Sequence, residues 1–92
     1  MIQSFADDDT EAVFLTGKSR RWATIARVAA RRLLALDFAS AVEDLRDPPG
    51  NRLEKLKGDR EGQWSIRIND QYRVCFRWDG TDAWDVEIAD HH

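Results

Sequence analysis

The second half of the chain alternates between apolar and polar residues, which is the pattern of β-strands that bury one face. The alternating runs cover residues 64–68, 72–78 and 84–89. Turn-rich segments at 69–71 and 79–82 separate these runs, as in hairpins. The pattern therefore predicts an antiparallel meander, to which residues 53–56 add a candidate fourth strand.

The first half has the period of amphipathic helices instead. One apolar stripe recurs at i, i+3, i+4 and i+7 spacing and consists of Trp22, Ile25, Ala26, Ala29, Leu33 and Leu36. Arg20, Arg27 and Arg31 fall on the opposite side, so we expect a helix whose outer face is basic.

Shorter elements surround this helix. One helix is expected to run through Leu15, with Asp9 or Thr10 as its N-cap and Gly17 as its stop. Another is expected over residues 39–45, before the Pro48-Pro49-Gly50 breaker.

Residues 2–5 alternate weakly and predict a short first strand. The architecture expected for residues 1–92 is a single α+β domain. In it, an N-terminal strand and the helices pack on one face of a small antiparallel sheet.

The alternation also assigns side chains to the two faces of the sheet. Residues expected in the core include Trp64, Ile66, Val74 and Phe76, and all four Trp residues, Trp84 among them, recur on the core faces. The other face is expected to carry Ser65, Arg67, Arg73 and Arg77. On this reading, truncating Arg73 opens no cavity.

Neighbouring arginines on one surface repel each other unless an anion or an acid compensates them. Asp85 or Glu87 on the last strand could supply that acid. The surface is thus either a phosphate-binding platform or a solvated ladder of arginines and acids.

The net charge of −3 argues against a nucleic-acid binder, but the charges are segregated along the chain. Residues 18–36 hold six basic residues and no acid, and residues 52–77 hold seven basic residues against four acids. Such clustering produces a local positive field on an acidic protein.

Several classes of protein are excluded. The single Cys75 excludes a disulfide framework and a cysteine-based zinc site, and no apolar run reaches the length of a membrane span. No nucleotide-binding glycine motif, HExxH motif or nucleophile elbow is present. We expect a soluble, cytoplasmic domain with no cofactor, no metal and no membrane partner.

Three stretches carry a family resemblance. They read Leu56-Lys57-Gly58-Asp59-Arg60-Glu61-Gly62 with Trp64-Ser65-Ile66, then Asn69-Asp70-Gln71-Tyr72-Arg73-Val74-Cys75-Phe76, and finally Val86-Glu87-Ile88-Ala89-Asp90-His91-His92. In these stretches the chain resembles the HigB branch of the RelE/ParE toxin superfamily. The resemblance implies a RelE-like fold and a toxin of a type II toxin–antitoxin pair that cleaves mRNA in the ribosome. It also implies a HigA-like helix-turn-helix antitoxin, through which the pair binds operator DNA.

The resemblance assigns roles to individual residues. Lys57 matches the basic residue placed on the RNA backbone, and Arg73 matches the arginine that stabilises charge at the scissile phosphate. Asp90 and His92 match the C-terminal catalytic pair. Further contacts to RNA are expected from Arg60, Arg67, Gln71 and Arg77.

Two positions depart from the family pattern. His91 stands where this branch often has Tyr, and Glu54 stands where some relatives have His. Both are candidate auxiliary groups, and the identity of the general base stays open. His92 is expected to protonate the leaving 5′-oxygen, because histidine titrates near neutrality and Asp90 favours its charged form.

Two alternatives remain. A ParE-like member would inhibit a protein target such as gyrase without catalysis, and a binding module would dock its basic helix onto an acidic partner. The set of Lys57, Arg73 and His92 favours the ribonuclease, because ParE-like members generally lack it.

Overall fold

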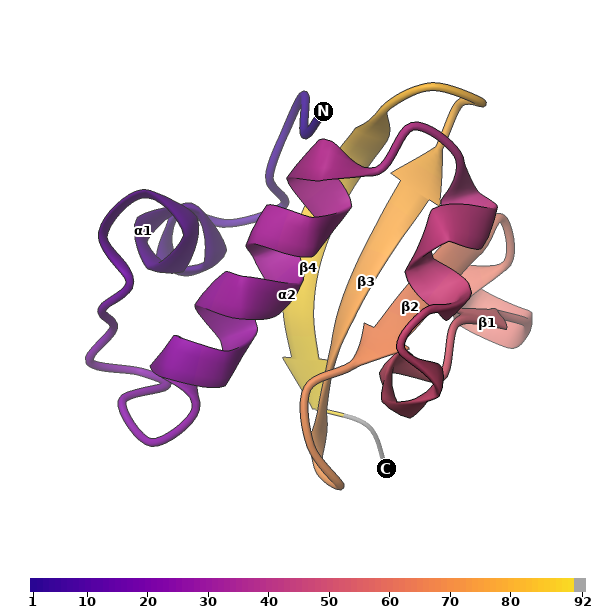
Figure 1. Cartoon of the computed structure of the whole chain (residues 1–92). Coiled ribbons are helices and arrows are strands. Elements are labelled where there is room, and N and C mark those ends of the chain that lie inside the picture. Colours follow the sequence, from indigo (N-terminus) through magenta and orange to yellow (C-terminus); the bar gives the residue numbers. More distant parts are fainter. Residues whose placement is uncertain (91–92) are drawn as a thin grey trace.

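The computed structural model describes residues 1–90, and four of its strands form one antiparallel sheet in the order β1-β2-β3-β4 (Figure 1). The strands are β1 (Glu54–Lys55), β2 (Gln63–Arg67), β3 (Tyr72–Trp78) and β4 (Ala83–Asp90). The meander is confirmed, including the short strand expected within residues 53–56.

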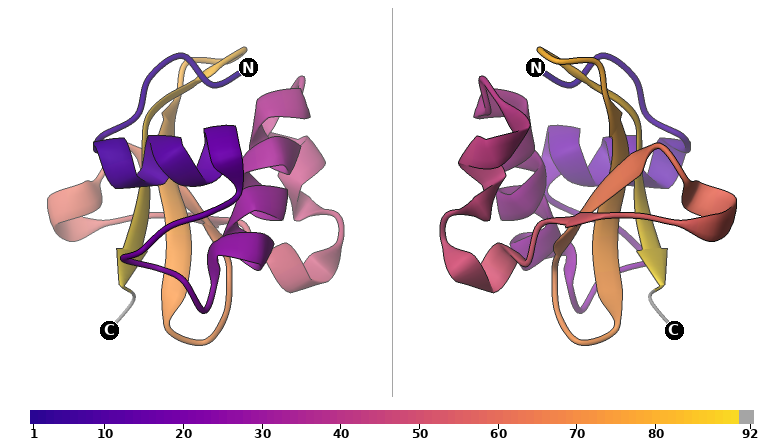
Figure 2. Two further views of the ribbon diagram at one scale, coloured as in Figure 1. Left: turned by 90° about the vertical axis from the view of Figure 1, so that its left-hand side faces the viewer. Right: turned by 90° about the vertical axis from the view of Figure 1, so that its right-hand side faces the viewer.

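Two α-helices and two 3₁₀ turns pack against the sheet. They are α1 (Asp8–Thr16), α2 (Ala26–Phe38), η1 (Val42–Arg46) and η2 (Pro49–Asn51). Helix α2 and these two turns lie over one face, and α1 lies beside α2 at the outer edge of β4 (Figure 2). A third 3₁₀ turn, η3 (Gly58–Arg60), lies on the opposite side of the sheet from α2 (Figure 2). The sheet therefore has one face under α2, η1 and η2, and the segment around η3 lies over the other face (Figure 2).

The residues that cap α1 are only partly those expected. Gly17 ends the helix in the left-handed region at φ 72°. The N-cap, however, is Asp7 rather than Asp9 or Thr10, because its carboxylate Oδ1 accepts a hydrogen bond of 2.6 Å from the Thr10 amide. In a run of three aspartates, spacing alone does not identify which one caps the helix.

The basic helix starts later than the apolar stripe suggested. Trp22 and Ile25 lie in a turn before α2, closed by a 3.0 Å hydrogen bond from the Ile25 amide to the Trp22 carbonyl. Both side chains are still buried in the core. The turn therefore directs them to the same side as the apolar residues of α2, although it is not helical itself. The helix expected over residues 39–45 is instead the 3₁₀ turn η1.

The core lies between the helices and the sheet. On the sheet side Ile66 pairs with Val74, Val74 pairs with Ile88, and all three are buried. Leu33 and Leu36 of α2 belong to the same buried cluster. The expected inward phase of β2 and β3 is thus confirmed.

The inward phase of β4 breaks at a bulge. Cys75 pairs with Glu87 and Arg77 pairs with Trp84, so β4 holds one residue more than β3 over this stretch. Asp85, within the bulge, has a left-handed φ of 52°. As a result Trp84 is 41% exposed, and the expectation that it faces the core is wrong.

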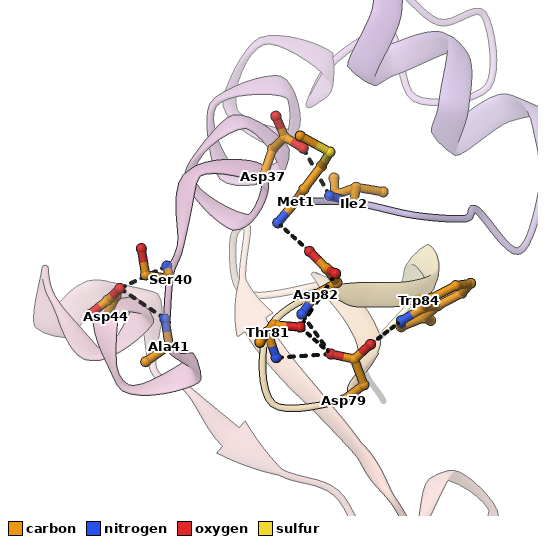
Figure 3. A network of polar contacts seen from close by, with 10 residues as sticks. All are labelled: Met1, Ile2, Asp37, Ser40, Ala41, Asp44, Asp79, Thr81, Asp82 and Trp84. Carbon is orange, nitrogen blue, oxygen red and sulfur yellow. Dashed lines mark hydrogen bonds and ion pairs between the residues drawn. The ribbon is translucent and has the colours of Figure 1, made fainter.

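The N-terminal segment forms two isolated parallel bridges to β4, at Ile2 with Ala83 and at Phe5 with Val86, rather than a full strand. Polar contacts then hold this end of the molecule together (Figure 3). Asp37, near the end of α2, accepts a hydrogen bond of 2.8 Å from the Ile2 amide.

The turn between β3 and β4 is organised by one carboxylate. Asp79 accepts hydrogen bonds from the amides of Thr81 and Asp82, at 2.9 and 2.7 Å, and from the Trp84 indole at 2.8 Å (Figure 3). These donors, the Asp82 amide first, hold the pKa of Asp79 well below its usual range. The exposed ring of Trp84 is thereby fixed against the turn.

Candidate functional site

Four arginines gather on the face of the sheet opposite α2, and each pairs with a carboxylate. The pairs are Arg60–Glu87 at 2.8 Å, Arg77–Asp85 at 3.5 Å, Arg73–Glu54 at 3.9 Å and Arg67–Asp70. We call these four residues the arginine face. Asp85 does compensate an arginine as expected, whereas Glu87 pairs with Arg60 of η3 rather than with an arginine of the strands.

Arg73 is buried, which corrects the expectation that it stands on an open surface. Only 4% of the residue is exposed, and Ser65 beside it is completely buried. Its Nε donates to Ser65 Oγ at 2.7 Å, and its Nη2 donates to the Arg52 carbonyl at 2.6 Å. Alternation had indicated the correct face, but it could not show that other segments cover this part of the face.

Arg73 also connects separate parts of the chain. Through Arg52 and Glu54 it ties the start of β1 to the centre of the sheet. Arg52 has a left-handed φ of 45°, so its backbone turns there toward the sheet. Burial lowers the pKa of the Arg73 guanidinium, and the nearby Glu54 carboxylate opposes that shift. The cation is therefore held in place by carbonyl, hydroxyl and carboxylate oxygens.

Cys75 lies at the centre of the arginine face. By strand register its neighbours are Ser65 on β2 and Glu87 on β4. Burial raises the pKa of its thiol, while the charge of Arg60 partly offsets that rise. Cys75 is thus a free, buried residue that fills the sheet between two polar neighbours.

Arg60 reaches the sheet from η3. Its Nη1 donates to Glu87 Oε1 at 2.8 Å and to Gln63 Oε1 at 3.2 Å. The hydrogen bond to Glu87 raises the pKa of Arg60. Gly62 makes room nearby, because a Cβ at this position would lie 3.2 Å from Nη1 of Arg77. These contacts fold the segment after η3 onto the arginine face.

Gln71 and Asp90 meet where β3 begins and β4 ends. Gln71 Nε2 donates to Asp90 Oδ2 at 3.1 Å, and Asn69 Oδ1 accepts from the amides of Gln71 and Tyr72. The structure therefore brings these two expected site residues together. His91 and His92, the other expected residues at this end, lie outside the described residues.

Lys57 is exposed, and its side chain makes no hydrogen bond or ion pair with any residue from 1 to 90. It immediately precedes η3 in extended backbone, with φ −126° and ψ 177°. The structure thus leaves this cation available to an external group, in contrast to the paired arginines.

A pocket of about 310 Å³ opens beside Asp90 and Arg60 at the outer edge of β4. Among its lining residues are Tyr72, Arg21 and Trp22. The Arg21 guanidinium stands 4.5 Å from the centre of the Trp22 ring, a cation–π contact. Sequence reasoning missed Arg21 and Trp22 as site residues, because nothing in their spacing connects them to residues 57–90.

Residues 1–90 contain neither a cluster of metal-binding side chains nor a helix that could span a membrane. No group of three or more His, Cys, Asp or Glu side chains in this part of the chain is arranged to hold a metal ion. Within the same residues, every helix is too short or too polar to cross a membrane.

The small α+β fold is shared with a protein of known structure. The fold matches the YoeB–YefM complex from Staphylococcus aureus with a TM-score of 0.56 and 19% identity, covering 100% of this chain and 98% of that chain. At this level of identity, the match establishes the fold and not the activity.

Sequence comparison identifies the family. The family described as the RelE-like toxin of the type II toxin–antitoxin system HigB matches residues 3–92. The chain is 42% identical to toxin HigB-1 of Vibrio cholerae over 80 residues, covering 85% of this chain and 84% of the relative. It is 38% identical to endoribonuclease HigB of Proteus vulgaris over 61 residues, covering 66% and 65% of the two chains. The chain belongs to the HigB family of RelE-like toxins.

Proposed function

We propose that this protein is the toxin of a type II toxin–antitoxin pair and cleaves mRNA as a ribosome-dependent endoribonuclease. The observation that carries the proposal is the convergence of Arg60, Arg67, Arg73 and Arg77 on one sheet face. The relative from Proteus vulgaris is named an endoribonuclease, which supports the same reaction class.

The proposed reaction is an internal transfer at phosphorus. A base takes the proton of the ribose 2′-OH, the 2′-oxygen attacks the adjacent phosphorus, and the bond from phosphorus to the 5′-oxygen breaks. The products are a cyclic 2′,3′-phosphate and a 5′-hydroxyl, whose oxygen receives a proton from an acid. Negative charge grows on the phosphoryl oxygens during attack, so positioned cations accelerate the step.

The proposal assigns each site residue a role in this reaction. Lys57 contacts the RNA backbone, and Arg73 supports the scissile phosphate. His92 protonates the leaving oxygen, and Asp90 favours the charged imidazole. Contacts to the rest of the RNA come from the arginines Arg60, Arg67 and Arg77 and from the Gln71 amide. Auxiliary roles in proton transfer are assigned to His91 and Glu54.

The carboxylates that pair with the arginine face must release their arginines before RNA phosphates can bind there. Arg67 and Arg77 are only half-buried or exposed, so their pairs with Asp70 and Asp85 contribute little to stability and open at low cost. An RNA phosphate can therefore replace the carboxylate by forming a bidentate contact. We expect binding to weaken steeply with salt, because each phosphate contact releases counterions.

The partners follow from the same proposal. The matching family is described as a toxin of a type II toxin–antitoxin system, and the structural neighbour is a complex of YoeB with YefM, which together support an antitoxin partner for this chain. We propose a HigA-like helix-turn-helix antitoxin, operator binding through that antitoxin, and action in the cytoplasm on ribosomes and mRNA.

The proposal is tested by primer extension on mRNA in a translation extract. The wild type should cut mRNA only when ribosomes are present. Lys57→Ala should lower the cleavage rate about 10²–10³-fold, the typical effect of losing one charge-stabilising group. Lys18→Ala is the matched control, because it removes the same charge from an exposed lysine that has no assigned role in the site, and it should cleave like the wild type.

Three results would contradict the proposal. Growth arrest without mRNA cleavage would favour a ParE-like toxin acting on a protein target such as gyrase. Cleavage of naked RNA at the same rate would remove the ribosome dependence. Full activity of Lys57→Ala would remove the assigned site.

A further inference from the structure

One surface of α2 is not used by the proposed chemistry. Four residues at i, i+4, i+7 and i+11 form one stripe along the helix, and all are exposed: Arg27, Arg31, Leu34 and Phe38. We call them the α2 stripe. Phe38 is 76% and Leu34 is 50% exposed, although the opposite side of the same helix is buried in the core.

The charges on this stripe differ from those on the arginine face. Arg60, Arg67, Arg73 and Arg77 all pair with carboxylates of the chain itself. Arg27 and Arg31 form no ion pair with any residue in the described part of the chain. Two unpaired cations next to two exposed apolar side chains are typical of a protein-binding surface, because a partner can bury the apolar groups and neutralise the cations.

We propose that the α2 stripe is the docking surface for an amphipathic segment of the antitoxin that carries acidic and apolar residues. This inference rests on the proposed function, since it assumes that an antitoxin exists. Charge complementarity defines the partner: acidic residues opposite Arg27 and Arg31, and an apolar cluster over Leu34 and Phe38. A helix laid along α2 meets both kinds of residue in the order in which they occur.

The geometry favours a protein over RNA at this surface. Helix α2 lies on one side of the sheet, whereas the segment around η3 lies on the other side (Figure 2). The arginines of β3 also point away from α2, because they alternate with the core residues Val74 and Phe76. RNA held by the arginine face would have to pass around the sheet to reach α2. Phosphates also give no reason for an exposed Phe38, whereas an apolar partner side chain does.

The experiment compares two activities of the same variants. The probe is the protein encoded beside this chain's gene, purified as the complex and titrated against the toxin by calorimetry. Leu34→Ala with Phe38→Ala truncates the apolar pair, and Arg27→Glu with Arg31→Glu reverses the two charges. Leu15→Ala and Arg46→Glu are matched controls, because they change exposed residues of the same types on other elements.

We expect the apolar double variant to bind the antitoxin at least about 30-fold more weakly, as when a hot-spot aromatic is truncated. Charge reversal should slow association and abolish its acceleration at low salt. Both variants should cleave mRNA in the translation extract like the wild type, and both controls should bind and cleave normally. In cells, the variants should stay toxic when the antitoxin is co-expressed.

Other results would distinguish a failure of the docking surface from a failure of the proposed function. Variants that keep antitoxin affinity but lose mRNA cleavage would show that α2 faces the ribosome or RNA, which would overturn the docking surface. Variants that keep both activities would also overturn it. A wild type that neither cleaves mRNA nor binds the neighbouring gene product would refute the proposed function itself. Circular dichroism of each variant excludes unfolding as the cause.

Discussion

The two faces of the sheet are both buried at their centres, but by different means. Toward α2, apolar side chains such as Ile66, Val74 and Phe76 pack against the helices and have no exposed surface. On the other face, Ser65 and Arg73 are equally enclosed, yet hydrogen bonds to a hydroxyl and to carbonyls replace apolar packing. The apolar face is stabilised by side chains that fill its volume, and the polar face is stabilised by directional hydrogen bonds. Truncating a side chain therefore has different consequences on the two faces.

The largest effect is expected on the apolar face. Leu33→Ala should lower the free energy of unfolding by about 2.7–5 kcal/mol, because Leu33 is fully buried and a cavity would remain. Leu34→Ala, at the adjacent exposed position of the same helix, should lower it by less than about 1 kcal/mol. Urea unfolding of both variants measures the difference. Equal losses would show that α2 does not present the face described here.

The second effect is expected on the polar face. Arg73→Ala should lower the free energy of unfolding by about 2–3 kcal/mol, because Ser65 and the Arg52 carbonyl lose a charged donor in a buried place. Arg77→Ala removes an exposed arginine from the same strand and should change it by less than about 1 kcal/mol. Thermal unfolding monitored by circular dichroism distinguishes them. An Arg73→Ala protein as stable as the wild type would instead agree with the expectation from alternation that Arg73 lies on an open surface.

A smaller effect on activity is expected from Glu54→Gln. Its carboxylate stands 3.9 Å from the Arg73 guanidinium. In the proposed mechanism this carboxylate competes with the substrate phosphate for that cation. Removing the charge should raise the cleavage rate by at most about fivefold, which corresponds to a pair worth up to about 1 kcal/mol. Primer extension in the translation extract provides the rate, and Glu43→Gln on η1 is the control with the same charge change. A lower rate for Glu54→Gln would instead assign the carboxylate a role in proton transfer.

The smallest effect concerns pH and the turn at Asp79. The Asp82 and Thr81 amides and the Trp84 indole lower the pKa of Asp79 in the folded protein. Its ionised form therefore stabilises the fold above the unfolded pKa of about 3.9, and this contribution is lost as pH falls toward the folded pKa. The stability difference between the wild type and Asp79→Asn should shrink below about pH 4. Urea unfolding of the two proteins above and below about pH 4 measures this change, and a difference that stays constant with pH would contradict the role assigned to Asp79.

Alternation in the sequence predicted the sheet well, because each of its strands buries a single apolar face. Ile66, Val74 and Ile88 lie where the period of two placed them. The same rule failed at Trp84, because one extra residue in β4 changes the phase and the period contains no information about bulges. It also failed for the environment of Arg73, because a period identifies the face of a strand but not the distant segment that covers it.

The site could be predicted only in part for similar reasons. The resemblance identified Gln71 and Asp90, which do meet at the end of the sheet. It gave no indication that Glu54 and the Arg52 carbonyl enclose Arg73, since this contact joins residues about twenty positions apart through backbone atoms. Arg21 and Trp22 reach the pocket beside Asp90 only through the packing of the first half of the chain.

The enclosure of Arg73 has a practical consequence for handling a protein that harms its host. A toxin is commonly produced as a harmless point variant, and a residue assigned to catalysis is the obvious choice for that variant. Here the same guanidinium anchors Arg52 and the first residue of β1, so its removal should free residues 52–54 to exchange their amide hydrogens rapidly. Antitoxin affinities or RNA footprints measured on such a variant would describe a loosened molecule. Lys57→Ala is the better substitute, because the Lys57 side chain is exposed and makes no hydrogen bond or ion pair with residues 1–90.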